Sequence, residues 1–220
     1  YGPFTVYYTL SNTGVRIFTP TDIQGLTLWL DANDSSTLYQ STTASGPVTA
    51  NGNPVRYWAD KSGRANHAST TSGTITYSTT GFNSKPSVYF AASQQFNVNP
   101  ALLPTGSAPA TYFFVKKALN TATVWVALAH GGGTDTRQFY YNTLANLQYD
   151  RAGTALMSDS GNYSNVNLIT SVQEGPVNYA FKYGNAFTTT ASTYTWNVGS
   201  TTDRKSTRLN SSHGYISYAV

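Results

Sequence analysis

The chain of 220 residues has no cysteine, one glutamate and one methionine, and only 10% of its residues are charged. Without cysteine it forms neither disulfides nor thiolate metal sites. No apolar run approaches the roughly 20 residues that a membrane-spanning helix needs. No charged-then-apolar export signal opens the sequence, which begins at Tyr1. We therefore expect no membrane insertion, and we expect neighbouring domains of a larger protein to carry any signal or anchor.

Helical periodicity is also lacking, because Gly, Pro, Thr and Ser interrupt every window in which apolar residues recur at three-and-four spacing. The sequence is instead rich in tyrosine (17 residues), threonine, serine, asparagine and glycine, with 40% hydrophobic and 14% aromatic residues. This composition favours half-buried strands and polar turns. Strands without intervening helices cannot make parallel crossovers. The predicted fold is therefore all-β, an antiparallel two-sheet β-sandwich.

Short strands separated by polar turns are expected along the whole chain. Their predicted ranges are 26–31, 55–60, 87–91, 111–116, 124–129, 137–142, 146–150, 167–172, 177–183 and 194–198. Residues 183–186 are expected to form a tight hairpin, since Gly and Asn tolerate positive φ. Residues 1–20 are expected to be a strand or linker from a preceding region, and residues 21–202 a single domain.

The net charge of +4 comes from basic residues scattered singly along the sequence. Lys116 and Lys117 are the one adjacent basic pair before the final segment. Residues 203–220 hold three bases and one acid, so residues 1–202 keep ten bases and eight acids, a net charge of +2. Nucleic-acid binding depends on a clustered basic surface, so we expect no nucleic-acid partner.

Three sequence runs in the first half of the chain carry a family resemblance. They are LWLDA at 28–32, WADKSG at 58–63 followed by NHA at 66–68, and KPSVYF at 85–90. These runs resemble the opening of laminin-G-like domains of bacterial surface, phage and large-virus proteins, and the resemblance extends over roughly residues 18–202. It implies a concanavalin A-like jelly roll with a binding or scaffold role, in an extracellular, cell-surface or virion protein. It does not identify a ligand.

The final segment, residues 203–220, resembles a translated sequencing-adapter read-through. On that interpretation the natural sequence ends near Thr202 and the closing strands of the domain are missing. A strand position in one sheet would then stand empty or be filled by foreign residues, since residues 215–220 alternate as a strand does. A genuine basic loop followed by a last strand is the alternative.

Catalysis is not expected. Glucanases of this fold class carry a strand motif of the form E-x-D-x-x-E, and a retaining glycosidase needs two carboxyl groups roughly 5 Å apart. Glu174 is the single glutamate and precedes Gly175 and Pro176 in a predicted turn. A degenerate glycoside hydrolase is kept as an alternative.

A calcium ion is the one cofactor that the sequence suggests. Laminin-G-like modules sometimes hold one, and Asp31, Asn33 and Asp34 supply hard oxygen ligands. The same residues suit a polar turn in which Asp31, Asp34 and Asp60 accept backbone N–H bonds, so both interpretations stay open. The histidines His67 and His130 are isolated in sequence and are not expected to bind metal.

Aromatic residues near polar loops are the candidates for a ligand-binding surface, because sugar rings stack on tyrosine and tryptophan. The candidates are Tyr140, Tyr141, Tyr149, Tyr163 and Trp196. Trp29 and Trp58 lie in apolar runs and are expected in the core. The predicted function is a non-catalytic module for carbohydrate binding or adhesion, with a glycan or surface-protein partner. A purely structural domain of a phage or viral particle is the alternative.

Overall fold

The computed structural model describes residues 18–70, 73–91, 94–99, 108–119, 125–130, 137–143, 146–151, 154–160, 165, 167–174, 177–182, 185–186, 207–210 and 214–219. In these ranges the helical segments are two 3-10 turns, η1 (Pro20–Asp22) and η2 (Ser35–Thr37). None of the helices in the described ranges has the length and apolar character needed to cross a bilayer.

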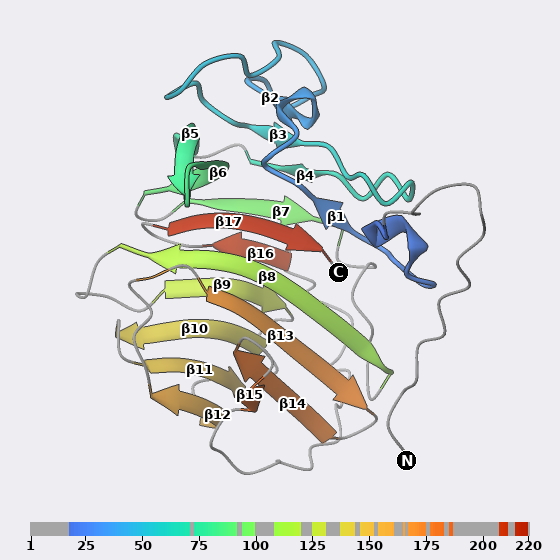
Figure 1. Ribbon diagram of the computed structural model, residues 1–220, viewed down its shortest axis with the longest axis vertical. Coiled ribbons are helices and arrows are strands. Elements are labelled where there is room, and N and C mark those ends of the chain that lie inside the picture. The colour runs from blue at the N-terminus through green and yellow to red at the C-terminus, as the bar shows by residue number, and fades with distance from the viewer. Residues whose placement is uncertain are drawn as a thin grey trace, which may run out of the picture.

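The described strands form two sheets (Figure 1). The first sheet contains β1 (Trp29–Leu30), β5 (Thr76–Phe82), β6 (Lys85–Phe90), β8 (Ala110–Ala118), β13 (Asn167–Glu174), β14 (Val177–Lys182), β15 (Asn185–Ala186) and β17 (Gly214–Ala219). The second contains β2 (Leu38–Tyr39), β3 (Tyr57–Trp58), β4 (Ala68–Ser69), β7 (Gln95–Val98), β9 (Trp125–His130), β10 (Arg137–Thr143), β11 (Asn146–Arg151), β12 (Thr154–Ser160) and β16 (Thr207–Asn210).

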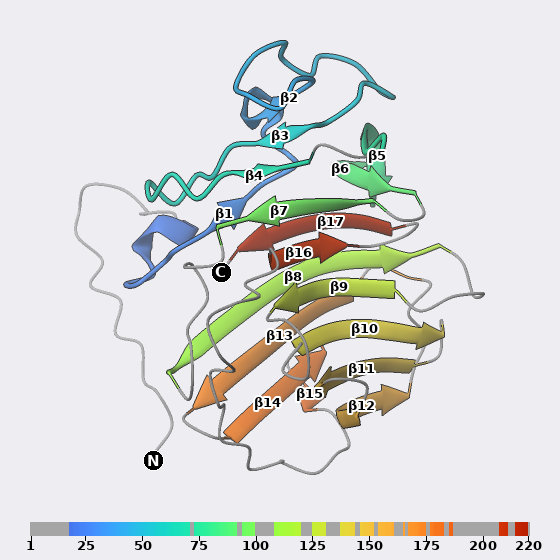
Figure 2. The ribbon, with the colours of Figure 1, turned by 180° about the vertical axis from the view of Figure 1, so that it is seen from behind.

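The eight-stranded sheet has the order β15-β14-β13-β8-β17-β6-β5, with β1 paired to β17, and the nine-stranded sheet has the order β12-β11-β10-β9-β16-β7-β4-β3-β2. Figure 2 shows the same two sheets from behind. Each pairing between the described strands is antiparallel. The prediction of a mostly β, antiparallel chain is therefore confirmed.

Several strands differ from their predicted ranges. The strands expected at 26–31 and 55–60 shorten to β1 and β3. Beside β1 the backbone bonds to side chains of the loop 60–67 in place of a neighbouring strand, whereas beside β3 single backbone bonds to Thr37, Tyr39 and Ile75 replace a longer ladder. Strands β5 and β12 were not predicted. Thr and Ser in their sequences, TYSTTGF and TALMSDS, obscure the apolar alternation that indicates a strand. The strand expected at 194–198 lies outside the described residues.

Aromatic rings from both sheets meet in the core. The ring centroid of Phe90 on β6 lies 5.6 Å from that of Phe96 on β7, edge to face, and Phe96 lies 6.0 Å from Trp58 on β3. All three side chains are fully buried. The placement of Trp58 in the core is confirmed. Trp29 is only half-buried, so its placement in the core is wrong, and the reason lies in its contact with Lys61 described below.

The last two described strands each take an interior position in one sheet, β16 in the nine-stranded sheet and β17 in the eight-stranded sheet. Strand β16 pairs with β7 and β9, and β17 pairs with β6, β8 and β1. Residues 207–210 and 214–219 thus join segments that are far apart in sequence. That these residues derive from an adapter stays a prediction.

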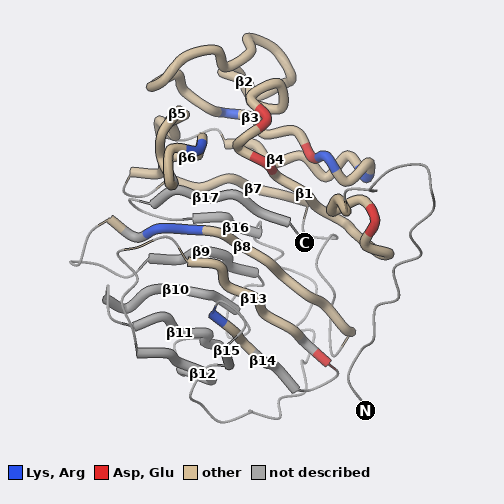
Figure 3. Tube along the Cα trace, viewed as in Figure 1, with Lys and Arg blue, Asp and Glu red and all other residues tan. Residues whose placement is uncertain are grey.

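Charged residues are sparse on the described trace (Figure 3). The adjacent bases Lys116 and Lys117 on β8 do not share a surface, because Lys116 is only 1% exposed whereas Lys117 is half-buried. In the antiparallel register Lys116 lies opposite Asn167, which is also buried. Burial holds the pKa of the Lys116 amine well below its usual range.

Candidate functional site

The carboxylate of Asp60 organises the loop that follows β3. Its Oδ1 accepts hydrogen bonds from the backbone N–H groups of Trp29 and Ser62, both at 2.8 Å. Its Oδ2 accepts from Ser62 Oγ at 2.6 Å and from the Asn66 backbone N–H at 3.0 Å. The prediction that Asp60 accepts backbone N–H bonds in a turn is confirmed, and the same bonds also tie the turn to β1.

The rest of this loop is fastened to the chain just before β1. The carbonyl oxygen of Thr27 accepts from Asn66 Nδ2 at 2.7 Å and from Ser62 Oγ at 3.2 Å. The backbone N–H of Lys61 donates to the carbonyl of Trp29 at 2.8 Å. Gly63 has φ +82°, a left-handed conformation that glycine adopts without steric cost. The run Asp-Lys-Ser-Gly-x-x-Asn is therefore a structural unit that positions its neighbours.

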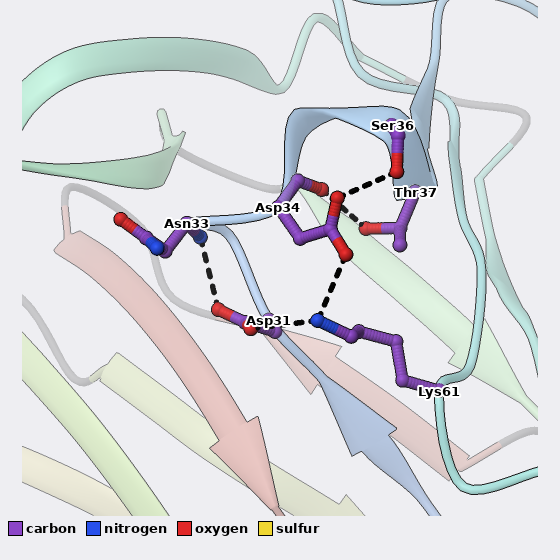
Figure 4. A network of polar contacts seen from close by, with 6 residues as sticks. All are labelled: Asp31, Asn33, Asp34, Ser36, Thr37 and Lys61. Carbon is purple, nitrogen blue, oxygen red and sulfur yellow. Dashed lines mark hydrogen bonds and ion pairs between the residues drawn. The ribbon is translucent and has the colours of Figure 1, made fainter.

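Lys61 connects this loop to the residues predicted to bind calcium (Figure 4). Its Nζ lies 3.0 Å from Asp31 Oδ2 and 2.8 Å from Asp34 Oδ2. Asn33 donates its backbone N–H to Asp31 Oδ1 at 3.0 Å, and its side chain is exposed and points away from Lys61 in Figure 4. Asp34 Oδ1 accepts from Ser36 Oγ. The structure thus brings two of the predicted metal ligands, Asp31 and Asp34, together around an ammonium group, and leaves the Asn33 side chain outside it.

The charges of this cluster stabilise one another. The hydrogen bond from Lys61, followed by that from Ser36, holds the pKa of the Asp34 carboxyl below its usual value. Burial alone would lower the pKa of Lys61, but its bonds to Asp34 and Asp31 outweigh burial and raise that pKa. Nζ also lies 4.4 Å from the ring centroid of Trp29, a cation–π contact that covers the indole and leaves it outside the core. Within the described ranges no three His, Cys, Asp or Glu side chains are arranged to hold a metal ion.

Three aromatic rings lie together at the nine-stranded sheet, one on β2, one on β3 and one just before β4. We call Tyr39, Tyr57 and His67 the aromatic face. Tyr39 and Tyr57 are in register, with ring centroids 5.9 Å apart and nearly perpendicular planes, and the His67 ring centroid lies 5.2 Å from that of Tyr57. All three are half-buried, whereas their sequence neighbours Leu38, Trp58 and Ala68 are fully buried. The alternation of a strand therefore places these rings on the face away from the core.

Polar side chains continue this row across the sheet. Ser69 on β4 is in register with Tyr57 on one side and with Asn97 on β7 on the other. Gln95 Nε2 donates to Asn97 Oδ1 at 3.2 Å, and all three of these polar residues are half-buried. The row from Tyr39 to Asn97 crosses four strands, which spans about 14 Å at the usual strand spacing of about 4.8 Å.

The motif loop fixes the proton of His67. The backbone N–H of Asp60 donates to His67 Nδ1 at 3.0 Å. In the neutral ring only one nitrogen carries a proton, so that proton is on Nε2 and is available as a hydrogen-bond donor. Burial, and then the nearby Tyr39, raise the pKa of the Tyr57 hydroxyl. Tyr57 therefore keeps its proton at neutral pH.

The aromatic residues predicted as ligand contacts lie on other strands of the nine-stranded sheet or outside the described residues. Tyr140 and Tyr141 are on β10 and Tyr149 is on β11. The register places Tyr140 opposite Gln148 and Tyr149 opposite Phe139. Tyr163 and Trp196 fall outside the described ranges. A binding role for these five residues stays a prediction.

Sequence reasoning missed the aromatic face. Tyr57 directly precedes Trp58, and the period of two that assigned Trp58 to the core assigns its neighbour to the opposite side. The sequence predicts of His67 only that it is isolated and does not bind metal. Its contact with Tyr57 depends on the pairing of β3 with β4, which brings Tyr57 opposite Ser69, two residues after His67.

Comparison with known proteins finds likeness in structure alone. No family model matches the sequence, and no curated protein matches it either. Domain 4 of AbnA, a GH43 extracellular arabinanase from Geobacillus stearothermophilus solved in complex with arabinotriose, is similar with a TM-score of 0.57 at 10% identity, over 88% of this chain and 90% of that domain.

Trypanosoma rangeli sialidase is similar over a smaller share of its length. A mutant displaying trans-sialidase activity gives a TM-score of 0.54 at 10% identity, and the complex with 2,3-difluorosialic acid gives 0.52 at 10% identity. In both cases the match covers 78% of this chain and 29% of the sialidase chain, so the chain spans less than a third of that enzyme. At these identities the likenesses show a related fold, that of β-rich portions of carbohydrate-active enzymes.

Proposed function

We propose that this chain is a non-catalytic carbohydrate-binding module with a concanavalin A-like jelly-roll fold, and that the aromatic face is its binding surface. The observation that carries the proposal is the row of Tyr39, Tyr57, Ser69 and Asn97 on one side of four adjacent strands. Sugars present apolar ring faces that stack on aromatic side chains, and hydroxyl groups that bond to amides and hydroxyls. A row of about 14 Å accommodates a short oligosaccharide.

The chemistry of the aromatic face suits a neutral ligand. Tyr57 keeps its proton, His67 accepts the Asp60 N–H at Nδ1 and so leaves Nε2 as a donor, and Asn97 and Gln95 offer both donors and acceptors. The structural neighbours agree with this proposal. The AbnA domain, which has nearly the same extent, was solved with an arabinotriose, and the sialidases act on sugars.

A non-catalytic role is supported by how the described carboxylates are used. Asp31 and Asp34 both bind Lys61, and Asp60 already accepts four hydrogen bonds within its loop. Glu174 is exposed at the end of β13. A hydrolase needs a carboxyl pair free to act on the sugar, or in sialidases a tyrosine nucleophile. The raised pKa of Tyr57 disfavours nucleophilic attack by its oxygen.

We infer that the module belongs to a larger extracellular, cell-surface or virion protein, in line with the resemblance of its motifs to laminin-G-like domains. In such a protein it would hold a catalytic or structural neighbour against a glycan.

A glycan array followed by calorimetric titration of the full chain tests the proposal. We expect the parent chain to bind with a Kd in the micromolar to millimolar range. Tyr57→Ala should raise that Kd at least about tenfold, a loss of about 1.4 kcal/mol in binding free energy. Tyr89→Ala on β6 of the other sheet is the matched control and should bind as the parent chain does. Binding that survives Tyr39→Ala and Tyr57→Ala unchanged, or release of sugar products, would contradict the proposal. Failure to bind any glycan would favour a purely structural role.

A further inference from the structure

We propose that the ammonium of Lys61 is the built-in cation of the Asp31–Asp34 turn, so that this chain closes the turn without calcium. A calcium ion beside Asp31, Asn33 and Asp34 is one of the two interpretations that the sequence leaves open. The structure instead places Lys61 Nζ between the two carboxylates, 3.0 Å from one and 2.8 Å from the other.

The ammonium and a calcium ion would compete for the same volume. Calcium binds carboxylate oxygens at about 2.3–2.6 Å, slightly closer than the two distances made by Nζ. An ion could therefore reach both Oδ2 atoms only if Nζ left the gap between them. A divalent cation and an ammonium this close would also repel each other.

The remaining ligands of the turn do not complete a calcium shell. Calcium in proteins takes about six to eight oxygen ligands. Asp31 Oδ1 accepts the Asn33 backbone N–H, Asp34 Oδ1 accepts the Ser36 hydroxyl, and the Asp34 carbonyl accepts Thr37 Oγ1 at 2.7 Å. These oxygens already accept hydrogen bonds within the turn, so the turn would hold a calcium ion only weakly, at millimolar concentration, and only once Nζ is gone. One lysine, with three donors, satisfies the two oxygens that are left.

Lys61 is also held in place by groups other than the carboxylates. Its backbone N–H donates to the carbonyl of Trp29, and its Nζ lies over the ring of the same residue. The side chain is 22% exposed, so most of its surface is shielded from solvent. A cation attached to the chain and positioned at both ends does not depend on the concentration of a free ion.

Thermal unfolding of the full chain with calcium or EDTA tests this proposal independently of any sugar binding. We expect the Tm of the parent chain to be the same in 5 mM EDTA and in millimolar CaCl2. Lys61→Met keeps the stem and removes the charge, and its Tm should fall by about 3–6 °C, the shift expected from losing two partly exposed ion pairs and a cation–π contact. Millimolar calcium should recover part of that loss.

Two further variants separate this outcome from general salt effects. Lys61→Met combined with Asp34→Asn should lose the response to calcium, because one of the two carboxylates is neutral. Lys85→Met, at an exposed lysine, should behave as the parent chain does in both solutions. The proposal is overturned if calcium stabilises the parent chain and Asp34→Asn abolishes that effect. It is also overturned if Lys61→Met unfolds at the parent temperature, or if calcium leaves its lowered Tm unchanged.

Discussion

The carboxylate of Asp60 accepts the backbone N–H of Trp29 at 2.8 Å, across 31 positions of sequence. This bond occupies the place of a strand-to-strand hydrogen bond beside β1, and it fixes the loop from which both Lys61 and His67 project. The conspicuous sequence motif of the first half is therefore a scaffold. It holds an ion pair on one side and orients one ring of the aromatic face on the other.

Replacement of Asp60 should be among the most destabilising changes in this loop. Asp60→Ala leaves four donors without their acceptor, and we expect a loss of about 3 kcal/mol in the free energy of unfolding. Asp60→Asn retains one carbonyl acceptor and should lose about half as much. Urea unfolding followed by tryptophan fluorescence measures both. Equal midpoints for Asp60→Ala and the parent chain would show that the network has no structural role.

Backbone conformation gives a second prediction in the same loop. Gly63 has φ +82° with no atom within 4 Å of an added Cβ, so Gly63→Ala meets no clash but should cost about 1 kcal/mol through backbone strain. Ala65 has φ +58°, and Ala65→Gly should be neutral or slightly stabilising. The two variants make opposite exchanges at two positions of positive φ, so Ala65→Gly should have the higher urea midpoint. A lower midpoint for Ala65→Gly than for Gly63→Ala would contradict the positive φ at these positions.

The ion pair between Lys61 and Asp34 should depend on pH in a defined way. The pKa of Asp34 is lowered from 3.8 on folding, so its contribution is present above that value and is lost as the pH falls through the folded pKa. The pKa of Lys61 is raised from 10.5, so its contribution is present below that value and is lost as the pH rises through the folded pKa.

A double-mutant cycle of Lys61→Met and Asp34→Asn measures that coupling. We expect a coupling below about 1 kcal/mol at pH 7, since both side chains are partly exposed, and a coupling near zero at pH 2. A coupling that persists undiminished at pH 2 would exclude an ionic origin.

The buried amine of Lys116 should make stability depend on pH in the opposite direction to Lys61. Its folded pKa lies well below 10.5, so the unfolded chain binds the additional proton, and stability should rise with pH from the folded pKa up to about 10.5. Lys116→Met should remove this rise and leave the chain at least as stable at neutral pH. Lys117→Met, one residue along β8, should retain it. Urea midpoints of the parent chain, Lys116→Met and Lys117→Met, measured between pH 6 and pH 10, test this. The same change of midpoint with pH in all three proteins would contradict the burial of Lys116.

Much of the architecture was predictable because it depends on local pattern. The period of two in the apolar runs assigned Trp58 to the core and located β6, β8, β10, β11, β13 and β14 to within a few residues. The antiparallel arrangement followed from strands without crossover helices. Strands rich in Thr and Ser, such as β5, have little apolar alternation and were therefore not predicted.

The candidate site was less predictable because it depends on contacts between distant segments. Asp31 and Asp34 were recognised as a cluster of oxygens, but nothing local indicates that Lys61, 30 positions from Asp31, lies between them. The same holds for Trp29, which local hydrophobicity places in the core and Lys61 keeps at the surface. The aromatic face exists only because β2, β3 and β4 pair side by side.

The most direct test of carbohydrate binding at the aromatic face is a titration of ring-labelled tyrosine resonances in the full chain with an oligosaccharide selected on the array. Assignments come from Tyr39→Phe, Tyr57→Phe and Tyr89→Phe. We expect saturable shifts at Tyr39 and Tyr57 and unchanged positions at Tyr89. Shifts confined to Tyr89, or to tyrosines outside the nine-stranded sheet, would contradict it.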